Sequence, residues 1–289
     1  MSTAPVTTPY RVSDWDGETG ARWVAHQVRL DAMLAPFGDA ALDAADPRPG
    51  ERVLDVGCGA GASSVDLAAR VGGEGRVLGL DISQALVERA RIVAAGVPGT
   101  EFAVADAAEA ALPEAAYDLL FSRFGLMFFA DPVAALANLG KALRPGGRLV
   151  FVCWRAAGLN DWVRLPMGAI AGIVPPSPPP DPEAPGPFSF GERARVERIL
   201  AAAGFDRIAM TPLDHAIPFG QGASREEAVE DAVAMAFDVG PLSRALAHAS
   251  PQVRGRAAEA VHAAFAARPG EHSVMIDGAA WIVTARRPG

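Results

Sequence analysis

The amino-acid sequence predicts an α/β protein with a doubly wound, mostly parallel sheet covered by helices. Two observations lead to this fold class. Between residues 50 and 155, short apolar segments typical of buried strands alternate with segments whose apolar residues recur at helical spacing. The connections between these segments are short, so successive strands are expected to run parallel through right-handed crossovers. Ligands bind such sheets beyond the carboxyl ends of the strands, and functional residues are expected there.

The first half of the chain contains five expected strands with helices between them. The strands are Arg52–Val56, Arg76–Leu80, Glu101–Ala105, Tyr117–Phe121 and Arg148–Trp154. One helix covers Ala62–Val71, a second follows the N-cap Ser83, and a third begins at Pro132 after the N-cap Asp131. The run Pro145-Gly146-Gly147 predicts a tight turn before the fifth strand.

The second half is less regular and contains the segments expected to cover the site. The regular elements are a helix over Glu192–Ala203 and strand-like segments over Phe205–Thr211 and Ser273–Arg286, the last being either a hairpin or one long strand. The expected covers are helical patterns over Ser13–Ala35 and Ser224–Ala267 and a proline-rich loop over Val174–Phe190. We therefore divide the chain into an N-terminal helical lid (1–45) and a main domain (46–289) with cap insertions at about 155–190 and 214–270.

Composition and charge favour a cytoplasmic protein that does not bind long nucleic acid. The 289 residues include 26 Lys and Arg against 34 Asp and Glu, so the formal net charge is −8, and half of the residues are hydrophobic. An acidic chain without a basic run disfavours nucleic acid as a partner. Cys58 and Cys153 do not resemble a disulfide framework, the first residues lack the pattern of a secretory signal, and no apolar run is long enough for a membrane span. A homodimer is left open.

The strongest local signal is a glycine-rich loop that follows the first expected strand. Residues 53–61 read Val-Leu-Asp-Val-Gly-Cys-Gly-Ala-Gly. Glycine allows a sharp turn from strand to helix and lets a ligand approach the backbone closely. The helix that follows offers free N–H groups, as in dinucleotide-binding loops. With Ala62 as its third small residue, the loop also satisfies the loose Gly-x-Gly-x-x-Gly/Ala pattern, so the loop alone does not decide between cofactors.

Carboxylates at the strand ends help to distinguish a methionine-derived cofactor from a nicotinamide dinucleotide. Asp55 stands two residues before the first glycine, where it would repel a pyrophosphate but could accept a hydrogen bond from an ammonium group. A methionine-derived cofactor carries an ammonium group, and a nicotinamide dinucleotide does not. Asp81 ends the second strand, where an acid can bind the ribose hydroxyls of either cofactor. Asp106 could accept a hydrogen bond from an adenine amino group beside the Ala107 N–H, or it could be an ordinary turn or N-cap residue.

These motifs in this order resemble the class I S-adenosylmethionine-dependent methyltransferase family. The resemblance is carried by Glu51–Ser63, Asp81, Asp106, the run from Leu112 to Leu120, and Phe128–Trp154 with its Leu-Arg-Pro-Gly-Gly-Arg-Leu segment. It covers roughly residues 50–155 and is greatest for the branch that includes ubiquinone, menaquinone and natural-product methyltransferases. It implies a Rossmann-like seven-stranded sheet whose last strand is antiparallel, and the segment Ser273–Arg286 suits that strand.

The resemblance also implies cofactor-binding roles for individual residues. Asp55 and the backbone of Gly57, Cys58 and Gly59 would hold the methionine moiety of S-adenosylmethionine, with Ser122 nearby. A second group would hold the adenosine: Asp81 at the ribose, Ile82 against the adenine, and Asp106 with Ala107 at the adenine edge. Trp23 in the expected lid would cover the cofactor. The product would be S-adenosylhomocysteine.

The expected reaction is in-line methyl transfer to a small, hydrophobic or aromatic metabolite, with catalysis mainly by proximity. A general base is needed only if the nucleophile must lose a proton, and the candidates for a base or orienting group are His26, Arg123, His215 and Asp14. Each histidine could equally be a packed or solvated residue, and Arg123 could simply pair with an acid. The phenylalanines Phe121, Phe124, Phe128 and Phe129 would line a substrate pocket or belong to a packed sheet edge. The histidines and cysteines show no metal-ligand spacing, so no metal is expected.

Three other functions are compatible with parts of this pattern. A nicotinamide-dependent oxidoreductase would share the glycine loop, but Asp55 and Asp106 argue against it. A catalytically silent S-adenosylmethionine-binding protein would look the same in sequence, and only turnover separates it from an enzyme. Methylation of RNA or protein is disfavoured by the acidic charge and by the expected covers.

Overall fold

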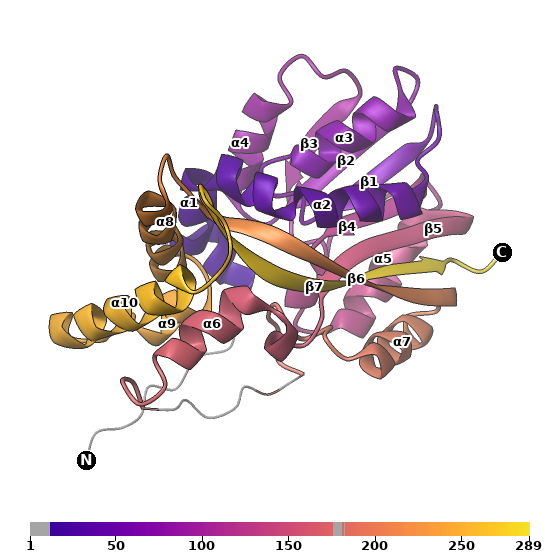
Figure 1. Cartoon of the computed structure of the whole chain (residues 1–289). Coiled ribbons are helices and arrows are strands. Elements are labelled where there is room, and N and C mark those ends of the chain that lie inside the picture. Colours follow the sequence, from indigo (N-terminus) through magenta and orange to yellow (C-terminus); the bar gives the residue numbers. More distant parts are fainter. Residues whose placement is uncertain (1–11, 176–180, 182) are drawn as a thin grey trace. The chain divides into compact units, whose positions relative to one another are not determined.

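The computed structural model describes residues 12–175, 181 and 183–289 (Figure 1). It contains a seven-stranded sheet with the strand order β3-β2-β1-β4-β5-β7-β6. The strands are β1 (Arg52–Val56), β2 (Arg76–Asp81), β3 (Thr100–Val104), β4 (Tyr117–Arg123), β5 (Leu143–Trp154), β6 (Asp206–Gln221) and β7 (Ser273–Arg286). From β3 to β5 every neighbouring pair is parallel, and β7 runs antiparallel to β5. This arrangement confirms the expected fold class.

The helices alternate with the strands in the first half and cluster in the second. Those before β5 are η1 (Val12–Asp16), α1 (Glu18–Ala25), α2 (Gln27–Ala45), α3 (Ala62–Val71), α4 (Gln84–Val93), η2 (Leu126–Phe128) and α5 (Pro132–Ala142). Those after β5 are η3 (Ala157–Leu159), α6 (Asp161–Ala169), α7 (Arg193–Ala202), α8 (Arg225–Asp238), α9 (Pro241–Ala245) and α10 (Pro251–Ala266). Ser83 and Asp131 cap α4 and α5 through their side chains, as expected.

The chain divides into two compact units, and two of the boundaries between them fall within β6 and β7. The larger unit consists of Tyr10–Arg155, Glu183–Leu213 and Ala280–Gly289, and the smaller unit contains Ala156–Pro182 and Asp214–Ala279. The two segments of the smaller unit begin near the expected cap insertions, although their role as a substrate cap stays a prediction. The N-terminal helices belong to the larger unit. Part of the predicted proline-rich loop, residues 176–180 and 182, and residues 1–11 lie outside the described residues.

Strand order in the larger unit creates a ligand-binding edge between β1 and β4. The chain runs from β1 outward to β2 and β3 and then returns to form β4 on the other side of β1. Right-handed crossovers place α3 and α4 on one face of the sheet and α5 on the other. The packing of α2 against α3, β4 and β5 adds it to the α3 face (Figure 1). The loops after β1 and β4 therefore meet at the point where strand order reverses, which is the usual ligand site of such sheets.

The central strands form the buried core of the larger unit. The apolar residues of β1, β4 and β5 are almost completely buried, including Leu54, Leu120, Phe121 and Phe151. Burial on both faces is expected of parallel strands covered by helices, and it explains why these strands read as continuous apolar runs rather than alternating ones. The rigid core fixes the positions of the loops at its carboxyl edge.

The structure differs from the expected elements at β5 and β6. The run Pro145-Gly146-Gly147, expected as a tight turn, lies within β5 at a shift of register, because Tyr117 pairs with Leu143 while Leu119 pairs with Arg148. Gly146 N and Gly147 O pair instead with the backbone of Arg287. Strand β6 also continues well past the predicted end at Thr211, whereas β7 is a single strand.

The smaller unit packs α6, α8, α9 and α10 together. Within it, two buried polar side chains connect the start of α6 to β7. The amide of Asn160 donates to Ala279 O (3.2 Å) and accepts from Ala279 N (2.9 Å), so it pairs with β7 as a neighbouring strand would. The carboxylate of Asp161 binds Arg164, Arg268 and the backbone N–H of Asp277. All hydrogen-bonding groups named here are matched, which makes this network a structural connection between α6 and β7.

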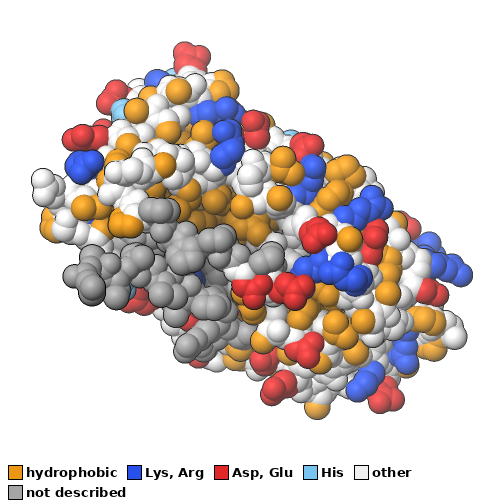
Figure 2. Space-filling view, turned by 90° about the horizontal axis from the view of Figure 1, so that it is seen from below, with side chains coloured by type: hydrophobic (Ala, Val, Ile, Leu, Met, Phe, Trp, Pro, Cys, Tyr) orange, Lys and Arg blue, Asp and Glu red, His pale blue; other side chains and the backbone are white. Residues whose placement is uncertain are grey.

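Charged side chains are mixed on the surface. On the face shown in Figure 2, basic and acidic side chains are interspersed and do not gather into a large basic patch. Across the described residues, no helix is both long and apolar enough to cross a membrane.

Candidate functional site

The glycine loop between β1 and α3 is held by the end of β2. Gly57, Gly59 and Gly61 have φ of +68°, +55° and +90°, a conformation that residues with a Cβ rarely adopt. The N–H groups of Gly57 and Cys58 both donate to Leu80 O, at 2.8 and 3.0 Å. A Cβ added at Gly57 would lie 2.9 Å from Gly125 Cα, while one added at Gly59 would meet nothing within 4 Å. The backbone at Gly59 therefore borders open space in which a ligand can approach.

Asp55 places a buried carboxylate with one unsatisfied oxygen beneath this loop. Its Oδ2 accepts hydrogen bonds from Ser63 Oγ (2.7 Å) and Ser64 Oγ (2.6 Å), both on the first turn of α3. Its Oδ1 is buried without a hydrogen-bond partner among the described residues. Burial raises the pKa of Asp55 to about 6, although the two serine hydroxyls and the charge of Arg123 lower it. A buried acceptor without a partner is costly, so this oxygen fits a cofactor that brings a hydrogen-bond donor or a positive charge.

Asp81 is a second carboxylate at the same loop. Its Oδ2 accepts from Gly59 N and its Oδ1 from Ser83 N, both at 2.9 Å. Burial raises its pKa, and its charge contributes to the raised pKa of Asp55. A carboxylate has about four acceptor positions, so each oxygen can still accept from a ribose hydroxyl. Two neighbouring carboxylates make this edge favourable for a cation and unfavourable for a pyrophosphate.

The residues after β3 have the local geometry of a turn. Asp106 Oδ1 accepts a hydrogen bond from Ala108 N at 2.9 Å, which is the turn-forming role that the sequence left open. Ala107 is buried, and Ile82, directly after Asp81, is half-buried. The contacts of these three residues with an adenine ring stay predictions.

Ser122 connects the ends of β1 and β4. Its hydroxyl donates to Val56 O at 2.7 Å and accepts from Gly125 N at 3.2 Å, and the side chain is completely buried. Because its single proton is used within the protein, Ser122 holds the loops after the two strands in place. The sequence indicated that Ser122 lies near this edge but not that its hydroxyl joins the two loops.

The N-terminal helices pack onto the start of α4, next to Asp81. A Cβ added at Gly20 would lie 2.6 Å from Ser83 Oγ and 2.2 Å from Trp15 O, so α1 makes a very close approach there. Gln84 N donates to Asp16 Oδ1 at 3.2 Å, and Arg89 Nε donates to Gln27 Oε1 at 2.9 Å. The sequence predicted a helical segment here but did not identify these contacts, because each joins residues more than 60 positions apart.

An aromatic group connects this N-terminal segment to the loop after β4. The ring of Trp15 makes edge-on contacts with Trp23 and Phe128, with ring centroids 5.4 and 5.1 Å apart. Trp23, the predicted cofactor contact, thus packs on Trp15. The fully packed aromatic residues lie elsewhere: Phe124 stacks on Trp154 at 4.2 Å, and Phe37 packs edge-on against both.

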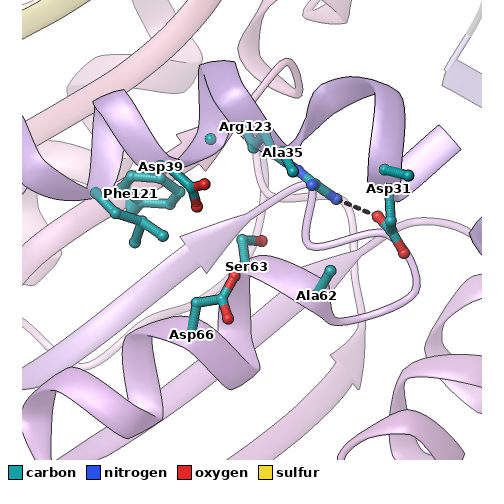
Figure 3. Close-up of a pocket in the computed structure, with 11 residues that line it drawn as sticks. Asp31, Ala35, Asp39, Ala62, Ser63, Asp66, Phe121 and Arg123 are labelled. Carbon is teal, nitrogen blue, oxygen red and sulfur yellow. Dashed lines mark hydrogen bonds and ion pairs between the residues drawn. The ribbon is translucent and has the colours of Figure 1, made fainter. Parts of the chain in front are cut away.

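Arg123 lines a cavity of about 220 Å³ between α2 and α3 (Figure 3). Its guanidinium forms an ion pair with Asp31 at 2.6 Å, and both side chains are largely buried. Asp39 on α2 and Ser63 and Asp66 on α3 also line the cavity. Burial raises the pKa of Asp66, and the charge of Asp39 adds to this effect. This cavity lies beside α3 and does not include Asp81 or Asp106.

The two histidines predicted as catalytic candidates belong to different units of the chain. His26 is half-buried at the junction of α1 and α2. His215 is an exposed residue of β6 and belongs to the smaller unit. Cys58 is buried, and burial raises the pKa of its thiol, so a nucleophilic role does not fit it. Among the residues with described positions, no group of three or more His, Cys, Asp or Glu side chains could hold a metal ion.

Most of the residues of this site lie in a part of the chain that is similar to known proteins. Residues 47–168 match the family model described as a methyltransferase domain. The chain is 38% identical over 121 residues to aklanonic acid methyltransferase DauC of Streptomyces sp. (strain C5), covering 41% of this chain and 55% of that protein. It is 33% identical over 183 residues to nocamycin O-methyltransferase of Saccharothrix syringae, covering 60% and 65% of the two chains.

Solved structures share the fold across most of the chain. The YcgJ protein of Bacillus subtilis superposes with a TM-score of 0.58 at 17% identity, covering 88% of this chain and 99% of its own. The [4+2]-cyclase SpnF superposes with a TM-score of 0.53 at 19% identity, covering 99% of both chains. At this level of identity the likeness establishes the fold alone.

The sheet topology and the paired carboxylates at the glycine loop define an α/β domain with a candidate ligand site at its switch point. More particularly, residues 47–168 match a methyltransferase domain, and the named relatives over this part of the chain are methyltransferases. The matches span 34%, 55% and 65% of the length of three curated relatives, so the relatives extend beyond the part that they share with this chain.

Proposed function

We propose that this protein transfers the methyl group of S-adenosylmethionine to a small, hydrophobic or aromatic metabolite. The observation that carries the proposal is the unpartnered Oδ1 of Asp55 beneath a glycine loop that also presents Asp81. The cofactor's ammonium group would donate to Asp55, and its ribose hydroxyls would donate to Asp81. The open space at Gly59 would admit the cofactor, and Asp106 with Ala107 would bind the adenine edge.

The same geometry disfavours a nicotinamide dinucleotide. Three N–H groups of the loop, those of Gly57, Cys58 and Gly59, already donate to Leu80 O and Asp81, which leaves fewer donors for a pyrophosphate. The charges of Asp55 and Asp81 would also repel it, whereas they attract the sulfonium and ammonium groups of S-adenosylmethionine. Charge and hydrogen bonding therefore select the same cofactor.

The cofactor supplies an activated methyl group, and the residues of this chain would supply binding, orientation and exclusion of water. The ion pair of Arg123 with Asp31 suits an orienting role or binding of an acidic group. His26 and His215 are the candidates for accepting a proton if the substrate must lose one.

A hydrophobic or aromatic substrate is supported by two observations. Phe128 and Phe129, just after β4, are half-buried, whereas Phe121 and Phe124 are buried in the packed core. The named relatives, an aklanonic acid methyltransferase and a nocamycin O-methyltransferase, belong by their names to natural-product methylation. We infer a small-molecule partner in the cytoplasm, without nucleic acid, membrane or metal, and we leave a homodimer open.

Calorimetric titration of S-adenosylmethionine and NAD tests the cofactor assignment. Wild-type protein should bind S-adenosylmethionine with micromolar affinity and should not bind NAD. Asp81→Asn and Asp81→Ala should weaken binding at least ~10-fold, since a charged acceptor for the ribose is lost. Asp118→Ala is the matched control, because Asp118 lies in β4 of the same sheet but accepts hydrogen bonds from Arg52 N and Arg144 at the opposite edge.

Turnover tests the second half of the proposal. Release of S-adenosylhomocysteine should be followed with a panel of hydrophobic phenols, carboxylic acids and amines, with His26→Ala and His215→Ala measured beside wild type. Methylation of one class, weakened by Asp81→Asn, supports the enzyme. Cofactor binding without turnover on any class would instead favour a catalytically silent binding protein, and binding of NAD alone would overturn the cofactor assignment.

A further inference from the structure

The indole of Trp15 presents a buried hydrogen-bond donor without a partner at the carboxyl edge of the sheet. Its Nε1 is buried and makes no hydrogen bond within the described part of the chain. An indole N–H can only donate, and a buried donor without an acceptor lowers stability. Such a group is retained more readily if a ligand supplies the missing acceptor.

The contacts of Trp15 connect it to the segments that follow β2 and β4, the two neighbours of β1. Its ring contacts Phe128, which follows β4, and its carbonyl oxygen lies against Gly20, which in turn packs against Ser83 after β2. Strand β1 lies between β2 and β4 in the sheet. A residue held to the segments after both neighbours therefore lies above the end of β1, where the glycine loop begins.

The chemistry of this edge leaves one cofactor group in need of a donor. S-adenosylmethionine carries a carboxylate beside its ammonium group. Near the loop, Asp55 and Asp81 are acceptors, and the N–H groups of Gly57, Cys58 and Gly59 already donate within the protein. Arg123 is paired with Asp31. The Trp15 N–H is a buried donor at this edge whose hydrogen bond is still to be made.

We infer that Trp15 Nε1 donates a hydrogen bond to the carboxylate of the bound cofactor and that Trp23 positions the Trp15 ring. The inference rests on the proposed function, because it requires a methionine-derived cofactor in the site. In this inference Trp15 is the residue of the N-terminal segment that contacts the cofactor. Trp23, the contact expected from the sequence, packs against the Trp15 ring instead. It also makes the cofactor carboxylate a specificity element.

The test compares S-adenosylhomocysteine with its decarboxylated analogue, titrated calorimetrically into wild type, Trp15→Phe and Trp23→Phe. Phenylalanine keeps an aromatic ring but removes the N–H. Trp15→Phe should weaken S-adenosylhomocysteine binding about 10-fold, as for loss of a charge-assisted hydrogen bond, and should leave binding of the analogue within about twofold of wild type. Trp23→Phe, which keeps the Trp15 N–H but loosens the ring that carries it, should weaken S-adenosylhomocysteine binding less than Trp15→Phe does and should also leave binding of the analogue close to that of wild type.

The outcomes separate the inference from the proposed function. Equal weakening of both ligands by Trp15→Phe would mean that Trp15 only packs at the site, and no effect on either ligand would mean that its N–H faces away from the cofactor. Either result overturns the inference while leaving the methyltransferase assignment intact. Failure of wild type to bind S-adenosylhomocysteine and S-adenosylmethionine would overturn both. A thermal melt of ligand-free Trp15→Phe should match or exceed that of wild type, which checks that the variant is folded.

Discussion

At the scale of single residues, the carboxyl group of Asp55 links folding stability to pH. Burial raises its pKa to about 6 from the usual 3.8, so the folded protein binds this proton more tightly than the unfolded chain does. The contribution of this group to the free energy of unfolding is therefore highest below about pH 4. It decreases between about pH 4 and pH 6 and is lost once the pH has risen through about 6. A pKa shift of one unit corresponds to about 1.4 kcal/mol.

Asp55→Asn should remove this dependence. The amide keeps an acceptor oxygen for Ser63 and Ser64 but cannot ionise. The difference in the free energy of unfolding between pH 5 and pH 8 should be about 1–2 kcal/mol smaller in the variant than in wild type, measured by urea denaturation without ligand. Asp81 and Asp66, whose pKa values are also raised, are present in both proteins, so the comparison isolates Asp55. Parallel pH profiles for the two proteins would contradict the argument.

Cofactor binding should show the opposite response to pH. The ionised carboxylate of Asp55 is the form that attracts an ammonium group, so affinity for S-adenosylmethionine should increase as the pH rises through about 6. The dissociation constant measured by calorimetry should be about 10-fold larger at pH 5 than at pH 7.5. Asp55→Asn should bind weakly at both pH values, with little difference between them. Wild-type affinity independent of pH over this range would show that Asp55 does not contact the cation.

At the scale of elements, α1 depends on one glycine to approach α4. Gly20→Ala would place a methyl carbon 2.2 Å from Trp15 O and 2.6 Å from Ser83 Oγ, so α1 must move away. Hydrogen exchange should become faster over η1, α1 and the first turn of α4, and cofactor affinity should fall several-fold. The central strands should keep their protection, since their contacts are unchanged. Gly17→Ala is the control, because the added carbon lies at an ordinary 3.7 Å from Asp14 O.

The elements also show what the sequence could and could not predict. Strands β1 to β4 were predicted within one or two residues of their bounds because apolar runs and glycine-rich turns are local signals. The bulge in β5 was not predicted, because Gly146 and Gly147 pair there with Arg287, which lies far away in the chain. In the site, the carboxylates of Asp55 and Asp81 follow from motifs, whereas the Arg123–Asp31 ion pair joins residues 92 positions apart and leaves no local pattern.

At the scale of the whole molecule, the predicted cofactor-binding residues all belong to the larger unit. The predicted cap insertions contribute the smaller unit, which has its own helices and its own buried polar network. A protein organised in this way should separate cofactor binding from substrate handling. Variants in the smaller unit should alter turnover while the affinity for the cofactor stays unchanged.

Asn160→Ala tests this separation. The side chain is fully buried, and its removal leaves the N–H and C=O of Ala279 without their partners, at a cost of about 2–4 kcal/mol to the smaller unit. Hydrogen exchange should accelerate in α6 and in residues 273–279, turnover should fall at least ~10-fold, and the calorimetric dissociation constant of S-adenosylhomocysteine should stay within about twofold of wild type. Gln252→Ala, an exposed change on α10 of the same unit, should leave all three quantities unchanged. If Asn160→Ala weakens cofactor binding as strongly as it lowers turnover, the two units do not divide the work, and the smaller unit must be counted as part of the cofactor site.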